Sequence, residues 1–343
     1  MDASAETLYF TDVGNHSVRA VDLATGIIAT VAGGRPPEMG ARPAGDGGPA
    51  AAAAFSTHPM RVALDGLGHL YVTDAHQNRV RRIDAASGVI TTAAGNGEEA
   101  FAGDGGPAIL ASLAVPHGCR FDRDGNFYIA DTRNHRIRRV DAATGVITTC
   151  AGTGEEGYSG EGQPALESKL YAPLAVDVAA NGDLYIVDTD NLRFRCLEAT
   201  TGILHTVAGC GGMGPTETGI PAVEAKFGRP RDIRVRGGQV YLVDGNNSSI
   251  FRLDLGSGLL HRVAGTGSSG FSGDGGPADR AQLDHCYSMA IDPAGNIYVK
   301  DSGNRRIRRV DAKSGLISTV AGSGERGFSG DGGPALEAAL DIG

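Results

Sequence analysis

Short stretches in which apolar and polar residues alternate follow one another along most of the chain. One representative unit contains four such stretches, separated by turns rich in glycine, asparagine and aspartate. Period-two alternation with this punctuation is typical of β-strands. We name the four predicted strands a, b, c and d in chain order: "PHGCRFD" (116–122), "FYIAD" (127–131), "HRIRRVD" (135–141) and "VITTCAG" (146–152).

The same unit recurs through the chain, and strand b is its clearest marker. Every copy of strand b has tyrosine second and ends in aspartate: 8–12, 70–74, 127–131, 184–188, 240–244 and 297–301. The final aspartates are 62, 57, 57, 56 and 57 residues apart, so six units fill the chain. Radial repetition buries both faces of every sheet, so we predict an all-β, six-bladed β-propeller with four-stranded antiparallel blades. We expect a single domain over residues 1–343, and a solenoid of strands is the alternative architecture.

A second repeat joins strand d of one unit to strand a of the next. The octapeptide "FSGDGGPA" occurs at 271–278 and 328–335, with near copies at 43–50, 101–108 and 158–165. Its glycines permit positive φ, its aspartate can accept backbone N–H bonds, and Pro-Ala suits the first turn of a short helix. An anion-binding nest is the alternative. Five copies favour the structural interpretation, a linker that acts as a hinge between blades.

Two motifs of the repeat carry a family resemblance. The segment "DRDGNFYIAD" (122–131), continued by "DTRNHRI" (131–137), resembles the NHL repeat, and the octapeptide looks like the linker of bacterial NHL arrays. The resemblance covers all six units and implies the propeller fold. It implies little about function, since the family includes protein-binding and RNA-binding scaffolds, sensor domains and some lyases.

Composition and charge narrow the range of partners. The 343 residues carry a net charge of −9, and only 6% are aromatic, so we expect neither nucleic acid nor an anionic membrane as the main partner. No apolar run is long enough to span a membrane. The start "MDASAETLYF" lacks the features of a signal peptide. We expect a cytoplasmic protein, or a secreted one from which a leader has been removed.

The topology of a meander predicts where a functional site would lie. The start of strand a, the b–c loop and the d–a linker share one face of the propeller, which we call the linker face. The turns of the other face are short and nearly identical between units. We therefore expect a site at the channel mouth on the linker face. Ionisable residues that recur at one repeat position are interpreted as structural, and those found in one unit only are candidates.

The start of strand a is where the units differ most. Directly after the first residue of the strand stand His117, Arg231 and Tyr287, where two other units have Met60 and Leu174. Neighbouring positions, the b–c loops and strand b of the last unit add further polar residues. We predict catalytic roles for His117, Arg231, Tyr287 and Asp232, and ligand binding by Arg61, Arg120, Asp177, His58, His285, His76, Asp190 and Lys300.

These residue types suggest acid–base chemistry on an anion. His117 would act as general acid or base, Arg231 and Arg61 would hold the anion, and Tyr287 would donate a proton or stabilise an oxyanion. Asp232 is an alternative base, held by its neighbour Arg231. Under a different interpretation the channel is only solvated, and its charges pair between blades, as Arg120 and Asp177 would.

A metal site is not expected from the sequence. Among enzymes built on this repeat, the chain most resembles the peptidyl-α-hydroxyglycine amidating lyases, in which histidine follows the strand-a proline in three blades and binds zinc. Only His117 matches that pattern, and zinc needs three or four converging ligands. We therefore expect no metal and no other cofactor, with a rearranged site of His58, His117 and His285 as the alternative.

Two functions from different classes remain open. We favour a propeller that binds a small polar or anionic molecule, as a metal-independent lyase, hydrolase or isomerase. The alternative is a scaffold that binds a protein partner, or a ligand sensor, using the same face. In the fourth linker, "CGGMGPTETGIPA" (210–222), which lacks the octapeptide, Met213 and Ile220 would then be apolar anchors.

The two ends of the chain predict an irregular closing blade. The first unit begins directly at strand b (8–12), and alignment of the last residues with the preceding unit leaves the inner strand incomplete. We expect strand a of the first blade to be short, split or absent. The channel would then be wider on that side, and strand b of this blade would exchange its amide hydrogens faster than residues 127–131 do.

Overall fold

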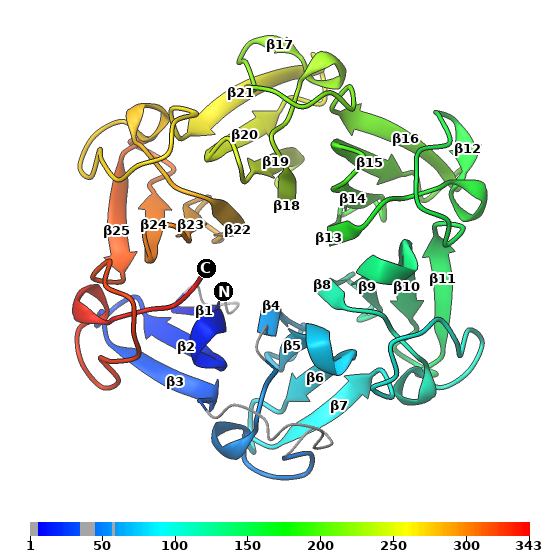
Figure 1. Ribbon diagram of the computed structural model, residues 1–343, viewed down its shortest axis with the longest axis horizontal. Helices are drawn as coiled ribbons and strands as arrows, with labels where there is room; N and C mark the ends of the chain where they lie inside the picture. Colours follow the sequence, from blue (N-terminus) through cyan, green and yellow to red (C-terminus); the bar gives the residue numbers. More distant parts are fainter. Residues whose placement is uncertain (1–5, 35–44, 57–58) are drawn as a thin grey trace.

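Six antiparallel sheets are arranged around a central channel in the computed structural model (Figure 1). The structure describes residues 6–34, 45–56 and 59–343. The all-β fold with six blades is thus confirmed. Blade 1 is formed by β1 (Thr7–Asp12), β2 (Ser17–Asp22) and β3 (Ile28–Gly33), blade 2 by β4 (Pro59–Leu64), β5 (Leu70–Asp74), β6 (Arg79–Ile83) and β7 (Ile90–Ala94), and blade 3 by β8 (Pro116–Phe121), β9 (Phe127–Asp131), β10 (Arg136–Val140) and β11 (Ile147–Ala151).

The remaining three blades repeat the meander, and two of them gain a short fifth strand from a linker. Blade 4 is formed by β12 (Gln163–Pro164), β13 (Pro173–Val178), β14 (Leu184–Asp188), β15 (Arg193–Leu197) and β16 (Ile203–Ala208), blade 5 by β17 (Ile220–Pro221), β18 (Pro230–Arg236), β19 (Gln239–Asp244), β20 (Ser249–Leu253) and β21 (Leu259–Ala264), and blade 6 by β22 (Cys286–Ile291), β23 (Ile297–Asp301), β24 (Arg306–Val310) and β25 (Ile317–Ala321).

The helices of the described segments are three-residue 3-10 turns of two kinds. Some follow strand b: η1 (Val13–Asn15), η3 (Ala75–Gln77) and η5 (Thr132–Asn134). Others follow the proline of a linker: η2 (Ala50–Ala52), η4 (Ala108–Leu110), η6 (Ala165–Glu167), η7 (Ala222–Glu224), η8 (Ala278–Arg280) and η9 (Ala335–Glu337). None of these helices is long and apolar enough to cross a membrane.

Each hydrophobic core cluster lies between two neighbouring blades. Between blades 3 and 4, for example, Ile137 and Ala151 pack with Val176 and Ile186, and all four are buried. Within one strand b, successive residues point alternately to the two clusters on either side of the blade, because side chains alternate between the faces of a strand. A blade is therefore stabilised mainly by its neighbours, which makes closure of the ring important for the stability of the whole molecule.

The octapeptide runs along the outer edge of the blade that follows it. Asp104 of one copy forms an ion pair with the fully buried Arg138 at 2.6 Å, and also accepts hydrogen bonds from Thr149. Arg138 also contacts Asp131, the last residue of strand b, at 3.2 Å. Phe101 of the same copy lies against the guanidinium of Arg138 at 4.8 Å. The aspartate of this linker thus binds a buried arginine and strand d, beyond the local turn bonds expected from the sequence.

The same arginine recurs in five blades and accounts for the five octapeptides. Each pairs with the acidic residue of the adjacent linker: Arg19 with Asp331, Arg81 with Asp46, Arg138 with Asp104, Arg195 with Glu161 and Arg308 with Asp274. In blade 5 the position is occupied by Phe251, and the linker beside it is the one that lacks the octapeptide. The acidic residue of each octapeptide therefore forms an ion pair with a buried arginine of the next blade.

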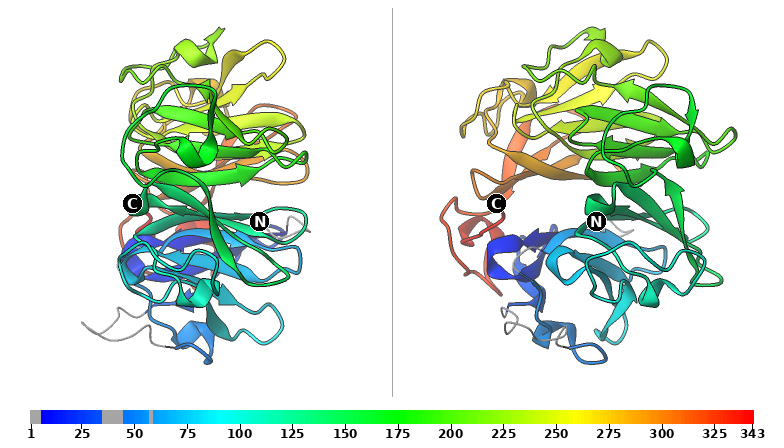
Figure 2. Two further views of the ribbon diagram at one scale, coloured as in Figure 1. Left: turned by 90° about the vertical axis from the view of Figure 1, so that its right-hand side faces the viewer. Right: turned by 45° about the vertical axis from the view of Figure 1, so that its right-hand side comes forward.

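The last octapeptide closes the ring on blade 1. Asp331 pairs with Arg19 of β2 at 2.8 Å. Beyond it, the backbone N–H of Asp341 donates to Asp12 at 2.7 Å, and its carbonyl accepts from Gly14 at 2.8 Å. Seen edge-on, the C-terminal segment lies on one face of the disc (Figure 2).

Blade 1 has three strands in the part of the chain that the structure describes, in agreement with the incomplete closing blade expected from the sequence, and residues 1–5, which precede β1, lie outside the described residues. The linker provides the closing contacts that a pairing between terminal strands would otherwise make. Among the described strands of blade 1, β1 is the innermost and lies next to the channel (Figure 1).

Candidate functional site

A β-bulge lies at the start of strand a in every blade that has this strand. In β13, Pro173 pairs with Asp188 and Ala175 with Val187, so the intervening Leu174 has no partner in the register. The equivalent skipped residues include Arg231 in β18 and Tyr287 in β22. Bulges re-aim the side chains they contain. The positions that differ most between units in the sequence are therefore positions at which the strand itself is irregular.

An ion pair between opposite blades crosses the channel. Arg61 of blade 2 extends to Asp232 of blade 5, with Nη1 2.7 Å from Oδ1, and blades 2 and 5 lie on opposite sides of the ring (Figure 1). The other terminal nitrogen of Arg61 donates to the carbonyl oxygens of Arg231 at 2.5 Å and Tyr287 at 3.3 Å. The Arg61 side chain is 10% exposed and that of Asp232 is fully buried. Side chains thus fill the middle of the channel at this level.

Both carboxylate oxygens of Asp232 are committed to structural contacts. Oδ1 also accepts from Nη1 of Arg234 at 2.7 Å, and Oδ2 accepts from the backbone N–H of Met289 at 2.9 Å. Burial alone would raise the pKa of Asp232, but the guanidinium groups of Arg234 and Arg61 hold it below its usual value. These contacts argue against the role of Asp232 as a base held by Arg231, because its partners are Arg61 and Arg234 instead.

A cavity of about 280 Å³ lies next to this ion pair, on the side away from the linkers. Residues from the ends of the inner strands line it, such as Leu64, Arg236 and Ile291, which adjoin the short a–b turns. On one side its wall is strand β1, because the described part of blade 1 has no inner strand in front of β1. This cavity therefore lies towards the end of the channel opposite the one expected from the sequence.

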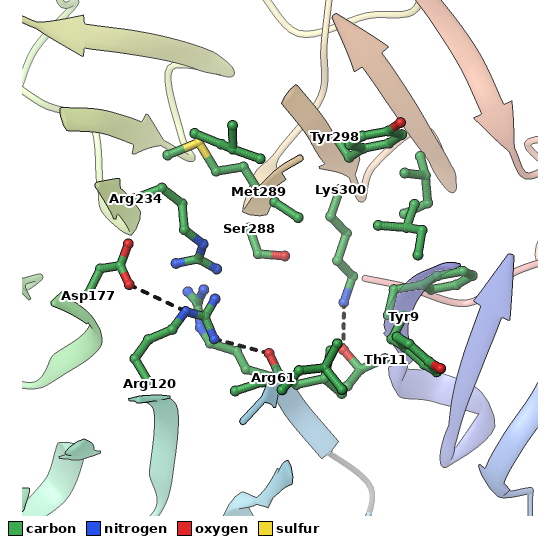
Figure 3. Close-up of a pocket in the computed structure, with 18 of the residues that line it drawn as sticks. Tyr9, Thr11, Arg61, Arg120, Asp177, Arg234, Ser288, Met289, Tyr298 and Lys300 are labelled. Atoms are coloured by element: carbon green, nitrogen blue, oxygen red, sulfur yellow. Dashed lines mark hydrogen bonds and ion pairs between the residues drawn. The ribbon is translucent and has the colours of Figure 1, made fainter. Parts of the chain in front are cut away.

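Cationic groups outnumber carboxylates around this cavity. The guanidinium groups of Arg61, Arg120 and Arg234 come close together, and Lys300 points into the same space from blade 6 (Figure 3). Asp177 lies beside Arg120, with 3.8 Å between Oδ1 and Nε, which is the pairing expected in a merely solvated channel. With Arg236, five cationic side chains line the cavity together with the carboxylate of Asp177, and Asp232 lies behind them.

Arg120 is held in place by backbone carbonyls and lies close to another cationic group. Its Nη1 donates to the backbone carbonyls of Val62 at 3.1 Å and Cys119 at 2.9 Å, so it is held rigidly between blades. Burial and the positive charge of Arg234 lower the pKa of Arg120 to about 10. Clustered guanidinium groups on rigid strands are typical of sites that bind carboxylate or phosphate.

Lys300 lines the cavity and is almost fully buried. The residue is 7% exposed, and its Nζ donates to Oγ1 of Thr11 at 3.3 Å. No ion pair links Lys300 to a carboxylate among the residues that the structure describes. Burial lowers the pKa of Lys300 to about 7, opposed by the charge of Asp12 and assisted by that of Arg61. Much of the amine is therefore uncharged at neutral pH.

We expect Lys300→Met to stabilise the protein at pH 7 by about 1 to 3 kcal/mol, because burying an amine without a carboxylate partner is costly. In the wild type the unfolded chain holds this proton up to a pKa of 10.5, whereas the folded chain releases it near 7. The penalty is thus complete below pH 7 and disappears as the pH rises towards 10.5. Denaturant titrations from pH 6 to 10 should show that the variant lacks this rise in stability. Substitution of the exposed Lys313 by Met is the control and should change little.

His117, Arg231 and Tyr287 form a separate group at the linker end of the channel. They do not contribute to the lining of the cavity. The Arg231 guanidinium lies 4.4 Å from the centre of the Tyr287 ring. Nδ1 of His117 is 3.0 Å from the carbonyl oxygen of Val115, and burial, with the nearby arginines, lowers its pKa to about 4. His117 is therefore neutral at pH 7, with Nδ1 as donor to that carbonyl.

The other predicted residues are spread over the linker face. Asp190 pairs with Arg229 at 3.4 Å, and His285 with Asp284 at 2.7 Å. The charge of His76 contributes to the lowered pKa of His117. His58 lies outside the described residues. Within the described segments, no group of three or more His, Cys, Asp or Glu side chains is placed to hold a metal ion.

Arg234 and Thr11 contribute to the cavity and were not among the predicted site residues. Arg234 occupies the repeat position of Arg120 and Asp177, so the repeat alignment contained the signal for it. Thr11 belongs to strand b of blade 1, where threonine also occurs in the next unit as Thr73. In the described part of the chain no strand lies between β1 and the channel, so Thr11 contributes to the wall of the cavity.

Comparisons with known proteins agree with this architecture. The NHL repeat family matches residues 113–140. "Protein SUPPRESSOR OF QUENCHING 1, chloroplastic" of Arabidopsis thaliana is 29% identical over 284 residues, which cover 79% of this chain and 26% of the plant protein. Teneurin-1 of Mus musculus is 28% identical over 304 residues, covering 77% of this chain and 11% of the mouse protein. The chain thus spans about a quarter or less of the length of these relatives.

Solved structures with the same fold have diverse functions. An auxiliary nutrient binding protein from Bacteroides thetaiotaomicron aligns with a TM-score of 0.63, 15% identity, and coverage of 96% of this chain and 77% of that one. Virginiamycin B lyase from Staphylococcus aureus aligns with a TM-score of 0.52 and 14% identity, and the alignment covers 93% of this chain and 82% of the lyase. A gluconolactonase from Xanthomonas campestris aligns with a TM-score of 0.53 and 14% identity, and the alignment covers 87% of this chain and 80% of that protein. At these identities the likeness concerns the fold.

Proposed function

Since this chain belongs to the NHL-repeat family of six-bladed β-propellers, we propose that it binds a small anionic molecule in the cavity of its central channel. The fold does not choose between functions, because propellers of this shape include enzymes and a nutrient-binding protein. The proposal is supported by one observation above all: the guanidinium groups of Arg61, Arg120 and Arg234 and the amine of Lys300 gather around one cavity (Figure 3).

Electrostatics and size indicate the class of ligand. Like charges held together in a partly enclosed space repel one another unless an anion neutralises them. The volume of about 280 Å³ suits a small organic acid better than a peptide or a nucleotide. Asp177, beside Arg120, would additionally select a ligand that carries a hydroxyl or another hydrogen-bond donor.

We expect glycolate, the smallest hydroxy acid, to bind in a one-to-one complex measured by titration calorimetry. Arg120→Gln and Arg234→Gln should each weaken binding at least about tenfold, because each removes a charge-assisted hydrogen bond to the carboxylate. The control is Arg229→Gln, which removes a partly exposed arginine from the linker face and should leave binding unchanged.

Variants at the other end of the channel distinguish the two candidate sites. His117→Ala and Arg231→Ala should leave glycolate binding intact if the cavity is the site. Loss of binding in these two variants, with full binding in Arg120→Gln, would place the site at the linker face instead. Absence of glycolate binding to the wild-type protein would contradict the proposal itself.

A further inference from the structure

Lys300 has a place in the cavity that the fold does not require. It is the fourth residue of strand b in blade 6, and the equivalent residues of the other blades are small or apolar: Thr11, Thr73, Ala130, Val187 and Val243. Ala130, Val187 and Val243 pack between blades, so a long amine at this position has to be explained by something other than the repeat.

The geometry around Nζ suits a reactive amine. The side chain of Lys300 extends from β23 towards β1 and ends in the cavity (Figure 3). Its hydroxyl partner, Oγ1 of Thr11 at 3.3 Å, does not compete for a proton as a carboxylate would. Burial with the charge of Arg61 nearby lowers the pKa of Lys300 to about 7, so the lone pair on nitrogen is available at neutral pH.

We propose that Lys300 captures a small oxo-acid as an imine, with the carboxylate of that acid held by Arg120 and Arg234. The proposal rests on the anion-binding function proposed above and names the ligand class as acids that carry an aldehyde or ketone. The arginines supply the charge that positions the carboxylate, and the amine supplies the nucleophile that reaches the carbonyl carbon.

The reaction needs no partner beyond the two groups. The lone pair of Nζ attacks the carbonyl carbon, and a proton moves from nitrogen to oxygen to give a carbinolamine. Loss of one water molecule then forms the carbon–nitrogen double bond, and addition of water reverses the step. No electron donor or acceptor is required. The hydroxyl of Thr11 lies within hydrogen-bond distance of Nζ and can orient it towards the carbonyl.

Reductive trapping of the full chain tests this inference. The protein is incubated with glyoxylate and cyanoborohydride at pH 7, and the modified lysines are located by peptide mass spectrometry. Lys226 and Lys313 are exposed and serve as internal controls. We expect Lys300 to be labelled at least about tenfold faster than either, although it is buried, because far more of its amine is uncharged. Glycolate has the same carboxylate and no carbonyl, so it should slow the labelling of Lys300 alone.

The outcomes separate this inference from the proposed function. Labelling of Lys300 at or below the rate of Lys226 and Lys313 would overturn the imine, and so would labelling that glycolate fails to slow. If glycolate still binds in calorimetry, the anion site stands and Lys300 only makes a structural contact with Thr11 of β1. In Lys300→Met, the peptide that contains position 300 should carry no label, while Lys226 and Lys313 should react as they do in the wild type.

Discussion

Asp232→Ala is expected to lower the free energy of unfolding by about 3 to 5 kcal/mol, the cost of leaving a buried charge unpaired. The substitution removes the carboxylate that Arg61 reaches from across the channel and that Arg234 contacts on the same strand. It also removes the acceptor of the Met289 N–H, which connects blade 5 to blade 6. Denaturant unfolding followed by circular dichroism measures the effect.

A second ion pair provides the matched control. Asp190 and Arg229 lie 3.4 Å apart, but both side chains are more than a third exposed. Asp190→Ala should therefore cost less than about 1 kcal/mol. In a double-mutant cycle, adding Arg61→Met to Asp232→Ala should recover part of the lost stability, since it removes one unpaired cation. An effect of Asp232→Ala no larger than that of Asp190→Ala would show that the bridge across the channel does not stabilise the ring.

Leu340→Ala is expected to cost about 2 to 5 kcal/mol and to loosen the closure of the ring. The Leu340 side chain is completely buried between blades 6 and 1, in one cluster with Leu8, Phe10 and Ile307. This part of the last linker holds blade 1 without help from an inner strand in the described part of that blade. A cavity here therefore weakens the contact on which closure depends.

Leu113→Ala is the control for this prediction. Leu113 has the same position in its linker and is equally buried, but it lies between blades 2 and 3. We expect a similar loss of global stability from both variants, since the same atoms are removed. Hydrogen exchange should distinguish them: Leu340→Ala should accelerate exchange in β1 (Thr7–Asp12) selectively, whereas Leu113→Ala should not. If amide hydrogens of β1 exchanged at the same rate in both variants, the last linker would not be what holds blade 1 in the ring.

The repeat made most of the fold predictable. Alternation within each unit identified the strands, and the spacing of the strand-b aspartates identified six blades. The octapeptide was also recognised as structural, but its main partner was not. Arg138 and its equivalents are fully buried in strand c, and only the folded linker shows that they meet Asp104 and its equivalents. Within the sequence, a hint was available, since the unit with Phe251 in place of this arginine also lacks the octapeptide beside it.

The site was predictable in its residue types and less so in its arrangement. Irregular positions of the repeat pointed to the channel, and Arg61, Arg120, Asp177 and Lys300 do meet in one cavity. The sequence grouped them with His117, which lies at the other end of the channel. The grouping depended on neighbours in sequence, whereas the contact between Arg61 and Asp232 joins residues 171 positions apart from opposite blades.

By itself, the sequence determined the secondary structure, the number of blades and the irregular first blade, because these depend on local alternation and on a period that repeats along the chain. Only the tertiary structure decided which charges meet. An inner strand presents its residues to a channel shared by six blades, and bulges at the start of the strand rotate some of them out of the regular alternation. The partner of Arg61, and the free space left beside it, are therefore set by side chains from distant units that come together only when the ring closes.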